Sequence, residues 1–178
     1  GGASSGGDGA DSLVDIEYIA GSRFADSLTG NNAANVLIGR AGADAINGGA
    51  GVDTASYRFA TGAVQATLTD LVAGHTGGSS AGADGVDSLV DIENLTGSNF
   101  ADTLTGNAGA NVLNGGLGND VLDGGAGVDT ASYDSVGAVT VSLAITGAQA
   151  TGGGGTDTLR NIENLTGSNS ADTLTGNA

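Results

Sequence analysis

The chain has 178 residues, including 35 Gly but no Pro, Cys, Met or Trp, and it carries a net charge of −16 from 20 Asp and Glu against 4 Arg. This charge argues against anionic partners such as nucleic acids and acidic membrane surfaces, and the missing cysteines exclude disulfides, thiolate zinc sites and cysteine nucleophiles. Because Leu, Ile, Val and Phe number only 38, we expect something other than a conventional apolar core to hold the chain together.

The sequence repeats itself on a long scale. DSLVDIE from Asp11 recurs at Asp87, and GGAGVDTASY from Gly48 recurs at Gly124. Both ends of the sequence lie inside such a unit, so we expect a piece of a longer protein. No apolar stretch approaches the roughly 20 residues of a membrane-spanning helix, and no transmembrane segment is expected. We divide the chain into a first unit at 1–81, a second at 82–151 and the start of a third at 152–178, all within one continuous solenoid.

A period of nine residues runs inside each unit. It is clearest from Gly97, where GSNFADTLT, GNAGANVLN, GGLGNDVLD and GGAGVDTAS follow one another. The glycines permit a crowded turn that the Asp closes, and the next three residues form a short strand whose middle residue, such as Leu104, points inward. Two nonapeptides would make one coil of about 18 residues, so the pattern predicts an all-β fold of stacked coils.

Three kinds of segment break this rhythm. Alternating apolar and polar residues at 63–68 and 138–143 predict one longer strand per unit, placed on the solenoid, with a hairpin packed on its side as the alternative. The Gly-, Ser- and Ala-rich stretch at 71–85 is expected to be a surface loop. The inward residues Leu89 and Leu95 are only six apart, which predicts a tighter half-coil that Ile92 helps to fill.

If the coils stack, the sixth residues of the repeats form columns at two edges. One edge would carry Asp87, Asp102 and Asp120, and the other Asn111 and Asp129; the matching positions elsewhere are Asp11, Asp26, Asn35, Asp44, Asp53, Asp157 and Asp172. Carboxylates about 5 Å apart repel by roughly 1 kcal/mol per pair even near the surface, and four Arg are too few to relieve this. A divalent cation would relieve it, and six to eight oxygens from carboxylates and turn carbonyls suit Ca²⁺ better than Mg²⁺ or Zn²⁺.

These segments resemble the RTX (repeats-in-toxin, or haemolysin-type) calcium-binding repeats, whose pattern is GGxGxDxUx with U large and apolar. GGLGNDVLD from Gly115 matches every position, GGAGVDTAS has Ala in place of U, and GSNFADTLT and GNNAANVLI lack some of the glycines. The resemblance covers nearly the whole chain. It implies a parallel β-roll, which is a right-handed β-solenoid with Ca²⁺ ions bound in the turns between coils.

The resemblance also implies a ligand set, in which carbonyls and the Asp of one turn face those of the next. One site would then use the carbonyls of Ser98, Phe100, Gly115 and Leu117 with the carboxylates of Asp102 and Asp120. The opposite edge would use Asn107, Gly109, Asn111, Gly124, Ala126 and Asp129, with Asn35, Gly48, Ala50 and Asp53 in the first unit. Because Asn carries no charge, this edge should bind calcium more weakly.

Three glutamates recur in the half-coils. Each of Glu17, Glu93 and Glu163 follows an Ile at the equivalent position of its unit. These glutamates could cap the calcium ladder or lie in a solvated turn.

The leading function is a Ca²⁺-dependent structural array of a secreted bacterial surface protein, adhesin or matrix fibre, which folds on Ca²⁺ binding outside the cell. No catalytic constellation is evident, so we expect no enzyme activity and no catalytic residue. The alternative is a calcium-binding accessory module of a secreted enzyme, such as a protease, lipase or polysaccharide epimerase. Copies of the chain could also stack into filaments or a surface layer, and the resemblance implies export by type I secretion.

Overall fold

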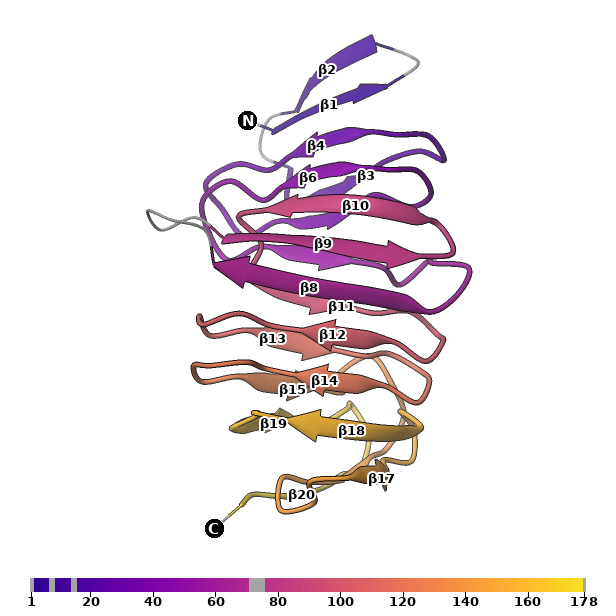
Figure 1. Cartoon of the computed structure of the whole chain (residues 1–178), viewed down its shortest axis with the longest axis vertical. Helices are drawn as coiled ribbons and strands as arrows, with labels where there is room; N and C mark the ends of the chain where they lie inside the picture. Colours follow the sequence, from indigo (N-terminus) through magenta and orange to yellow (C-terminus); the bar gives the residue numbers. More distant parts are fainter. Residues whose placement is uncertain (1, 7–8, 14–15, 71–75, 178) are drawn as a thin grey trace.

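The computed structural model describes residues 2–6, 9–13, 16–70 and 76–177. Within these ranges the chain forms twenty strands and no helix (Figure 1), and hence nothing there that could cross a membrane as a helix. The strands stack along the long axis of the molecule, with the two ends of the chain at opposite ends of the stack.

Two large sheets form the opposite faces of this stack. The first contains, in spatial order, β17 (Ala148–Ala150), β18 (Thr156–Arg160), β14 (Val121–Asp123), β12 (Thr103–Thr105), β8 (Val64–Asp70), β9 (Thr76–Gly82), β10 (Gly85–Val90), β6 (Ala45–Asn47), β4 (Ser27–Thr29), β1 (Gly2–Gly6) and β2 (Gly9–Leu13). The second contains β19 (Asn164–Thr166), β15 (Thr130–Ser132), β13 (Val112–Asn114), β11 (Asn94–Thr96), β7 (Thr54–Ser56), β5 (Val36–Ile38) and β3 (Tyr18–Ala20). A separate pair consists of β16 (Thr140–Ser142) and β20 (Thr173–Thr175).

The nine-residue period determines both the pairing and the core. Successive strands on each face come from repeats two apart, and they pair in parallel with Leu104 opposite Leu122 and Leu95 opposite Leu113. These four leucines are fully buried between the sheets. The triplet places one side chain inward and two outward, so inward side chains from both sheets, mostly Leu, Ile and Ala, fill the interior. This arrangement confirms the all-β parallel β-roll.

The first departure from the rhythm is a hairpin inserted into the first sheet. β8 pairs in parallel with β12, which confirms the longer strand predicted at 63–68 and its place on the solenoid. The expected surface loop at 71–85 is wrong for its described part, because β9 lies antiparallel between β8 and β10 (Figure 1); residues 71–75 lie outside the described residues. Gly78 stands between Leu68 and Leu89, and a Cβ there would overlap the backbone of Thr67. The small residues of this stretch therefore allow close strand packing.

The other two interruptions of the nine-residue period lie closer to their sequence-based predictions. β16 covers only part of the strand expected at 138–143, and it pairs in parallel with β20. The half-coil between β10 and β11 turns at Asp91, which has a positive φ of 51°, and Ile92 is buried beneath it. The same turn recurs at Asn161, with a φ of 50°. The half-coils therefore form as predicted and bring the chain from one face to the other in six residues.

Candidate metal sites at the turns

On one edge of the roll, each sixth-position carboxylate holds the backbone of the preceding turn. Oδ1 of Asp44 accepts the N–H of Asp26 at 2.9 Å, and Oδ1 of Asp120 accepts the N–H of Asp102 at 2.9 Å. All of these residues except Asp26 are buried. One carboxylate oxygen is thus used to fix the register of the coils, which leaves the second oxygen for other partners.

The position of Asp87 differs from the sequence prediction. Its Oδ1 accepts the N–H of Asp44 at 2.9 Å, so it continues the first unit's column. The expected placement next to Asp102 is wrong because β8 and β9 lie between β10 and β12. Asp102 instead accepts the N–H of Val64 at 2.7 Å. The inserted hairpin therefore divides this edge into two separate columns.

The opposite edge alternates Asn and Asp. Oδ1 of Asp53 accepts the N–H of Asn35 at 2.7 Å, and Oδ1 of Asp129 accepts that of Asn111 at 2.8 Å. The Asn111 amide nitrogen donates to the carbonyl of Glu93 at 2.7 Å. An amide suits this place, since the neighbouring half-coil presents a carbonyl that a carboxylate would repel.

One side-chain oxygen of the sixth residue, Oδ2 of an aspartate or the single Oδ1 of an asparagine, distinguishes two kinds of turn. In what we call closed turns, it accepts the backbone N–H of the second residue of the same repeat. The donor and acceptor pairs are Ser22 and Asp26, Asn31 and Asn35, Ser98 and Asp102, and Asn107 and Asn111. These oxygens therefore already have a partner within the chain.

In the other kind, which we call open turns, Oδ2 of the aspartate is buried and has no hydrogen-bond partner. This holds for Asp44, Asp53, Asp120 and Asp129. The second residue of each open turn has φ between +71° and +95°, which is the left-handed region: Arg40, Gly49, Gly116 and Gly125. An unpartnered buried carboxylate oxygen is costly, so these four atoms are the strongest indication of a cation site.

A neighbouring side chain holds the turn open. Oδ1 of Asn47 accepts the N–H of Gly49 at 2.9 Å, and Oδ1 of Asn114 accepts that of Gly116 at 3.0 Å. In the open turn of Asp129, Oδ1 of Asp123 accepts the N–H of Gly125 in the same way. These residues were not predicted from the sequence, although the sequence contains a signal: the residue before a closed turn is Ala or Thr instead.

Replacing Asn47 by Ala is therefore expected to weaken calcium binding at the Asp53 turn a few-fold. The released N–H of Gly49 can turn toward Oδ2 of Asp53 and close the site. Calorimetric titration with Ca²⁺ measures the change. Thr29→Ala, in the same place before a closed turn, is the control and should bind like the wild type; equal affinities in Asn47→Ala and the wild type would contradict this role.

Burial raises the pKa of the Asp44 carboxyl to about 6 and that of Asp120 to about 7. Removal from water is the main cause, the backbone N–H bonds oppose it, and the negative neighbours in each column add to it. Burial also raises the pKa of Asp53, Asp102 and Asp129. Without a cation the carboxyls of these columns therefore bind protons more readily than ordinary carboxyls do.

The backbone supplies further oxygens beside these carboxylates. The carbonyls of Ser98 and Phe100 face the second and fourth residues of the neighbouring open turn, both glycines, and the Gly115 carbonyl faces the first glycine of the closed turn. Oδ2 of Asp120 lies against Gly115, where a Cβ would overlap it. The structure thus gathers most of the predicted ligands into a space that no side chain fills, and every donor is an oxygen. A hard cation such as Ca²⁺ fits this donor set.

The other predicted ligands have varied surroundings. The carbonyls of Asn107, Gly109, Gly124 and Gly48 face glycines of the neighbouring coil in the same way. Ala50 and Ala126 donate their N–H groups to the carbonyls of Asn31 and Asn107, and the side chain of Leu117 is exposed.

The predicted ligands of the third unit and the chain start complete the set. Asp157 is buried, with Oδ1 on the N–H of Asp120 at 3.0 Å and Oδ2 on the Thr151 hydroxyl at 2.8 Å. Oδ1 of Asp172 accepts from Val139, and hydrogen bonds lower its pKa. The side chain of Asp11 lies outside the described residues.

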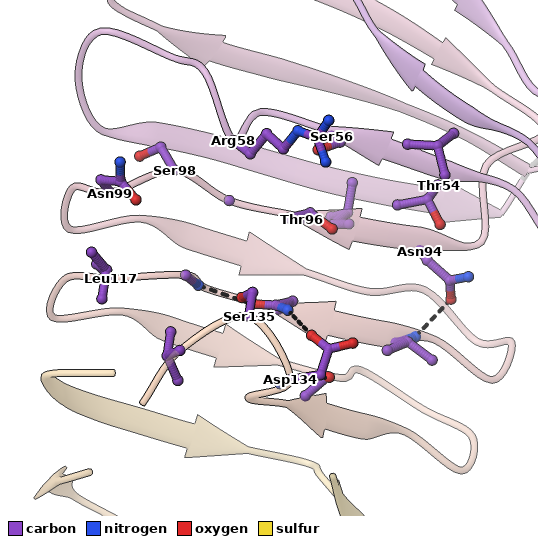
Figure 2. Close-up of a pocket in the computed structure, with 18 of the residues that line it drawn as sticks. Thr54, Ser56, Arg58, Asn94, Thr96, Ser98, Asn99, Leu117, Asp134 and Ser135 are labelled. Atoms are coloured by element: carbon purple, nitrogen blue, oxygen red, sulfur yellow. Dashed lines mark hydrogen bonds between the residues drawn. The ribbon is translucent and has the colours of Figure 1, made fainter. Parts of the chain in front are cut away.

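An open groove of about 700 Å³ crosses the outer face of the second sheet (Figure 2). Its polar side chains bond one another or the nearby backbone: Asn114 donates to Asp134 at 2.7 Å, and Asn94 accepts the N–H of Val112 at 2.8 Å. Asp134 is the only carboxylate among the lining residues. The groove therefore lies apart from the metal-site geometry.

Among the described residues, no three His, Cys, Asp or Glu side chains gather at one point, so any site must combine paired carboxylates with backbone carbonyls. A family model described as the RTX calcium-binding nonapeptide repeat, in four copies, matches residues 20–55 and 96–131. A search of curated proteins found no match. The two matched segments contain all four open turns.

Proposed function

We infer, from a chain that carries RTX calcium-binding nonapeptide repeats, that this protein is a calcium-dependent structural repeat whose open turns are completed by bound ions. The observation that carries the inference is the set of four buried carboxylate oxygens without a partner. A Ca²⁺ ion supplies two positive charges and accepts the carboxylates and carbonyls that adjacent turns present. The chain's own residues set the register of the coils and keep the aspartates of successive turns apart. The glycines of the turns leave the space beside the carboxylates free of side chains.

The proposed place of this structural repeat is outside the cell, in a bacterial surface protein, adhesin, surface layer or matrix fibre. Two features support this. The net charge of −16 disfavours the compact metal-free state, and calcium that binds only the folded chain stabilises it by mass action. The chain would stay unfolded and exportable where calcium is scarce and fold where it is abundant. The unit boundaries at 82 and 152 and the type I export route are part of this proposal.

A second proposal is an accessory module of a secreted enzyme such as a protease, lipase or polysaccharide epimerase. RTX repeats are structural calcium-binding modules and not catalytic ones, so the chemistry would belong to another part of the protein. The groove in Figure 2 is lined by Thr, Ser and Asn together with Val, Leu and Gly, with neither His nor Cys among its lining residues, and is more consistent with a contact surface than with a reaction centre.

Calcium titration tests the proposed function. We expect the far-ultraviolet circular dichroism of the chelated chain to resemble that of an unfolded chain, and to change to a β spectrum as Ca²⁺ reaches the millimolar range. EGTA should reverse the change, and the matched concentration of Mg²⁺ should not reproduce it, because Mg²⁺ demands a tighter octahedral site. A chain that keeps its β spectrum and melting temperature in EGTA would exclude calcium-dependent folding.

A further inference from the structure

The columns on the second edge meet a half-coil where another nonapeptide turn would be expected. Oε2 of Glu93 accepts the N–H of Asp53 at 2.8 Å, and Oε2 of Glu163 accepts the N–H of Asp129 at 2.8 Å. Elsewhere in the columns this bond is made by Oδ1 of an aspartate. A glutamate carboxylate from the half-coil therefore occupies the place of the next aspartate.

The backbone fixes each glutamate against its aspartate. The carbonyl of Asp53 accepts the N–H of Glu93 at 3.1 Å and that of the following residue at 2.9 Å. In the second unit, the carbonyl of Asp129 accepts the N–H of Glu163 at 3.1 Å and that of Asn164 at 2.9 Å. Because both the N–H and the C=O of the aspartate are bound to one short segment, the two carboxylates are held together in both units.

The aspartates of these pairs each carry an unsatisfied oxygen. Asp53 is 1% exposed and Asp129 is 0% exposed, yet Oδ2 of each has no hydrogen-bond partner. The second member of each pair is also a carboxylate, and the glutamate charge adds to the cost of ionising its aspartate in the second unit. A buried acceptor next to a second carboxylate requires a cation or a proton to balance it.

The unsatisfied oxygen faces a space that it shares with the half-coil. A Cβ at Gly48 would come within 2.6 Å of Oδ2 of Asp53 and would overlap the carbonyl of Asp91. The second unit repeats this arrangement, with Gly124 beneath the carbonyl of Asn161. The carboxylate oxygen and the half-coil carbonyl therefore converge where the chain has no side chain.

We propose that Ca²⁺ binds between Asp53 and Glu93 and between Asp129 and Glu163, so that the half-coil glutamates are calcium ligands and close the second-edge columns. The proposal rests on the calcium binding in the proposed function. Each site offers two carboxylates and a backbone carbonyl, all hard oxygen donors. A half-coil has no sixth-position aspartate, and the longer glutamate side chain reaches the ion from it.

The two sites are not equivalent, and they differ from the other sites on this edge. Each contains two carboxylates, whereas the turns of Asn35 and Asp53 share only one, so the glutamate site should bind Ca²⁺ more tightly. Glu93 is partly buried and Glu163 is exposed. We therefore expect the site of Glu93 to be the tighter of the two.

Counting the bound ions tests the proposal. Glu93→Gln keeps an oxygen that can accept the N–H of Asp53 but removes the charge, so a capping role would survive the change and a ligand role would not. After equilibrium dialysis at a Ca²⁺ concentration too low to fill turns that share one carboxylate, such as those of Asn35 and Asp53, elemental analysis should find one ion fewer per chain in Glu93→Gln and two fewer in the double variant with Glu163→Gln. Glu17→Gln is the matched control, since Glu17 is exposed and its carboxylate bonds no aspartate turn among the described residues.

Each outcome decides the proposal. An unchanged ion count and affinity in a folded Glu93→Gln protein, with calcium-binding wild type, would overturn the glutamate sites and leave the proposed function intact. Wild-type protein that binds no calcium would overturn both. Circular dichroism in millimolar Ca²⁺ checks that the variants fold; if Glu93→Gln does not, the exposed Glu163→Gln variant alone should lose one ion or the proposal fails.

Discussion

The metal-free protein is expected to lose stability as the pH rises from about 4 to about 7, whereas the calcium-loaded protein is expected to gain stability over the same range. The raised pKa values of Asp44 and Asp120, about 6 and about 7, lie above the ordinary value of 3.8. Between these limits the folded metal-free chain binds more protons than the unfolded chain, so raising the pH favours unfolding. With calcium present, the ion needs deprotonated carboxylates, and protons compete with it at low pH.

The size of this opposite dependence can be estimated. One pKa unit corresponds to about 1.4 kcal/mol, and water near the turns reduces the effect, so we expect on the order of 3 kcal/mol for the two groups together. For a chain of this length that is roughly 10 °C in melting temperature. Circular dichroism at a series of pH values measures it, through the melting temperature of the calcium-loaded protein and through the folded fraction of the dialysed protein. Parallel pH profiles in the two conditions would show that the ionisation of these carboxylates does not destabilise the metal-free fold.

The interior of the roll follows directly from the sequence, because one large apolar residue recurs every nine positions. Leu95, Leu104, Leu113 and Leu122 are each fully buried at the middle of a strand, where an inward residue between two outward ones must lie. The half-coil was also predictable, since six residues between Leu89 and Leu95 leave no room for a full turn. Local periodicity is sufficient for these elements because their partners are copies of the same pattern.

The inserted hairpin was not predictable in this way. β9 contains Gly, Ser, Thr and Ala without any apolar alternation, and it is held between β8 and β10 by the close approach that Gly78 permits. A strand that packs through missing side chains leaves no periodic signal. The predicted position of Asp87 was wrong for the same reason, because the hairpin decides which strands are neighbours and hence which aspartates form one column.

The aspartates of the candidate site were predictable, but the state of their second oxygen was not. Whether Oδ2 has a partner depends on the φ of the second residue in the turn, and Arg40 adopts +71° although it is not a glycine. The preceding Asn47 and Asn114 would have indicated two of the open turns. Their role depends on a side-chain bond to the N–H two residues later, and a consensus that records only Gly and Asp omits it.

Replacing Asp120 by Asn is expected to have opposite effects on the two states of the protein. The amide keeps an oxygen for the N–H of Asp102, which the carboxylate accepts at 2.9 Å, and it removes a buried charge whose pKa is raised to about 7. Its nitrogen can donate to a backbone carbonyl, as Asn111 does to Glu93. At pH 8 the metal-free variant should therefore be more stable than the wild type by on the order of 1–2 kcal/mol.

In saturating calcium the order should reverse. The variant loses a charged ligand shared by adjacent turns, and an ion present at about 100 times its dissociation constant stabilises the fold by about 2.7 kcal/mol. Urea unfolding at pH 8 in millimolar Ca²⁺ gives the difference for the loaded state. Folding of the metal-free chain in EGTA, induced by an osmolyte such as trimethylamine N-oxide, gives the other difference. Asp134→Asn removes the same charge from an exposed residue and should change neither state by more than about 0.5 kcal/mol. If Asp120→Asn were less stable than the wild type in both conditions, the buried oxygen would serve the fold itself, and calcium would not be what the open turn is built to receive.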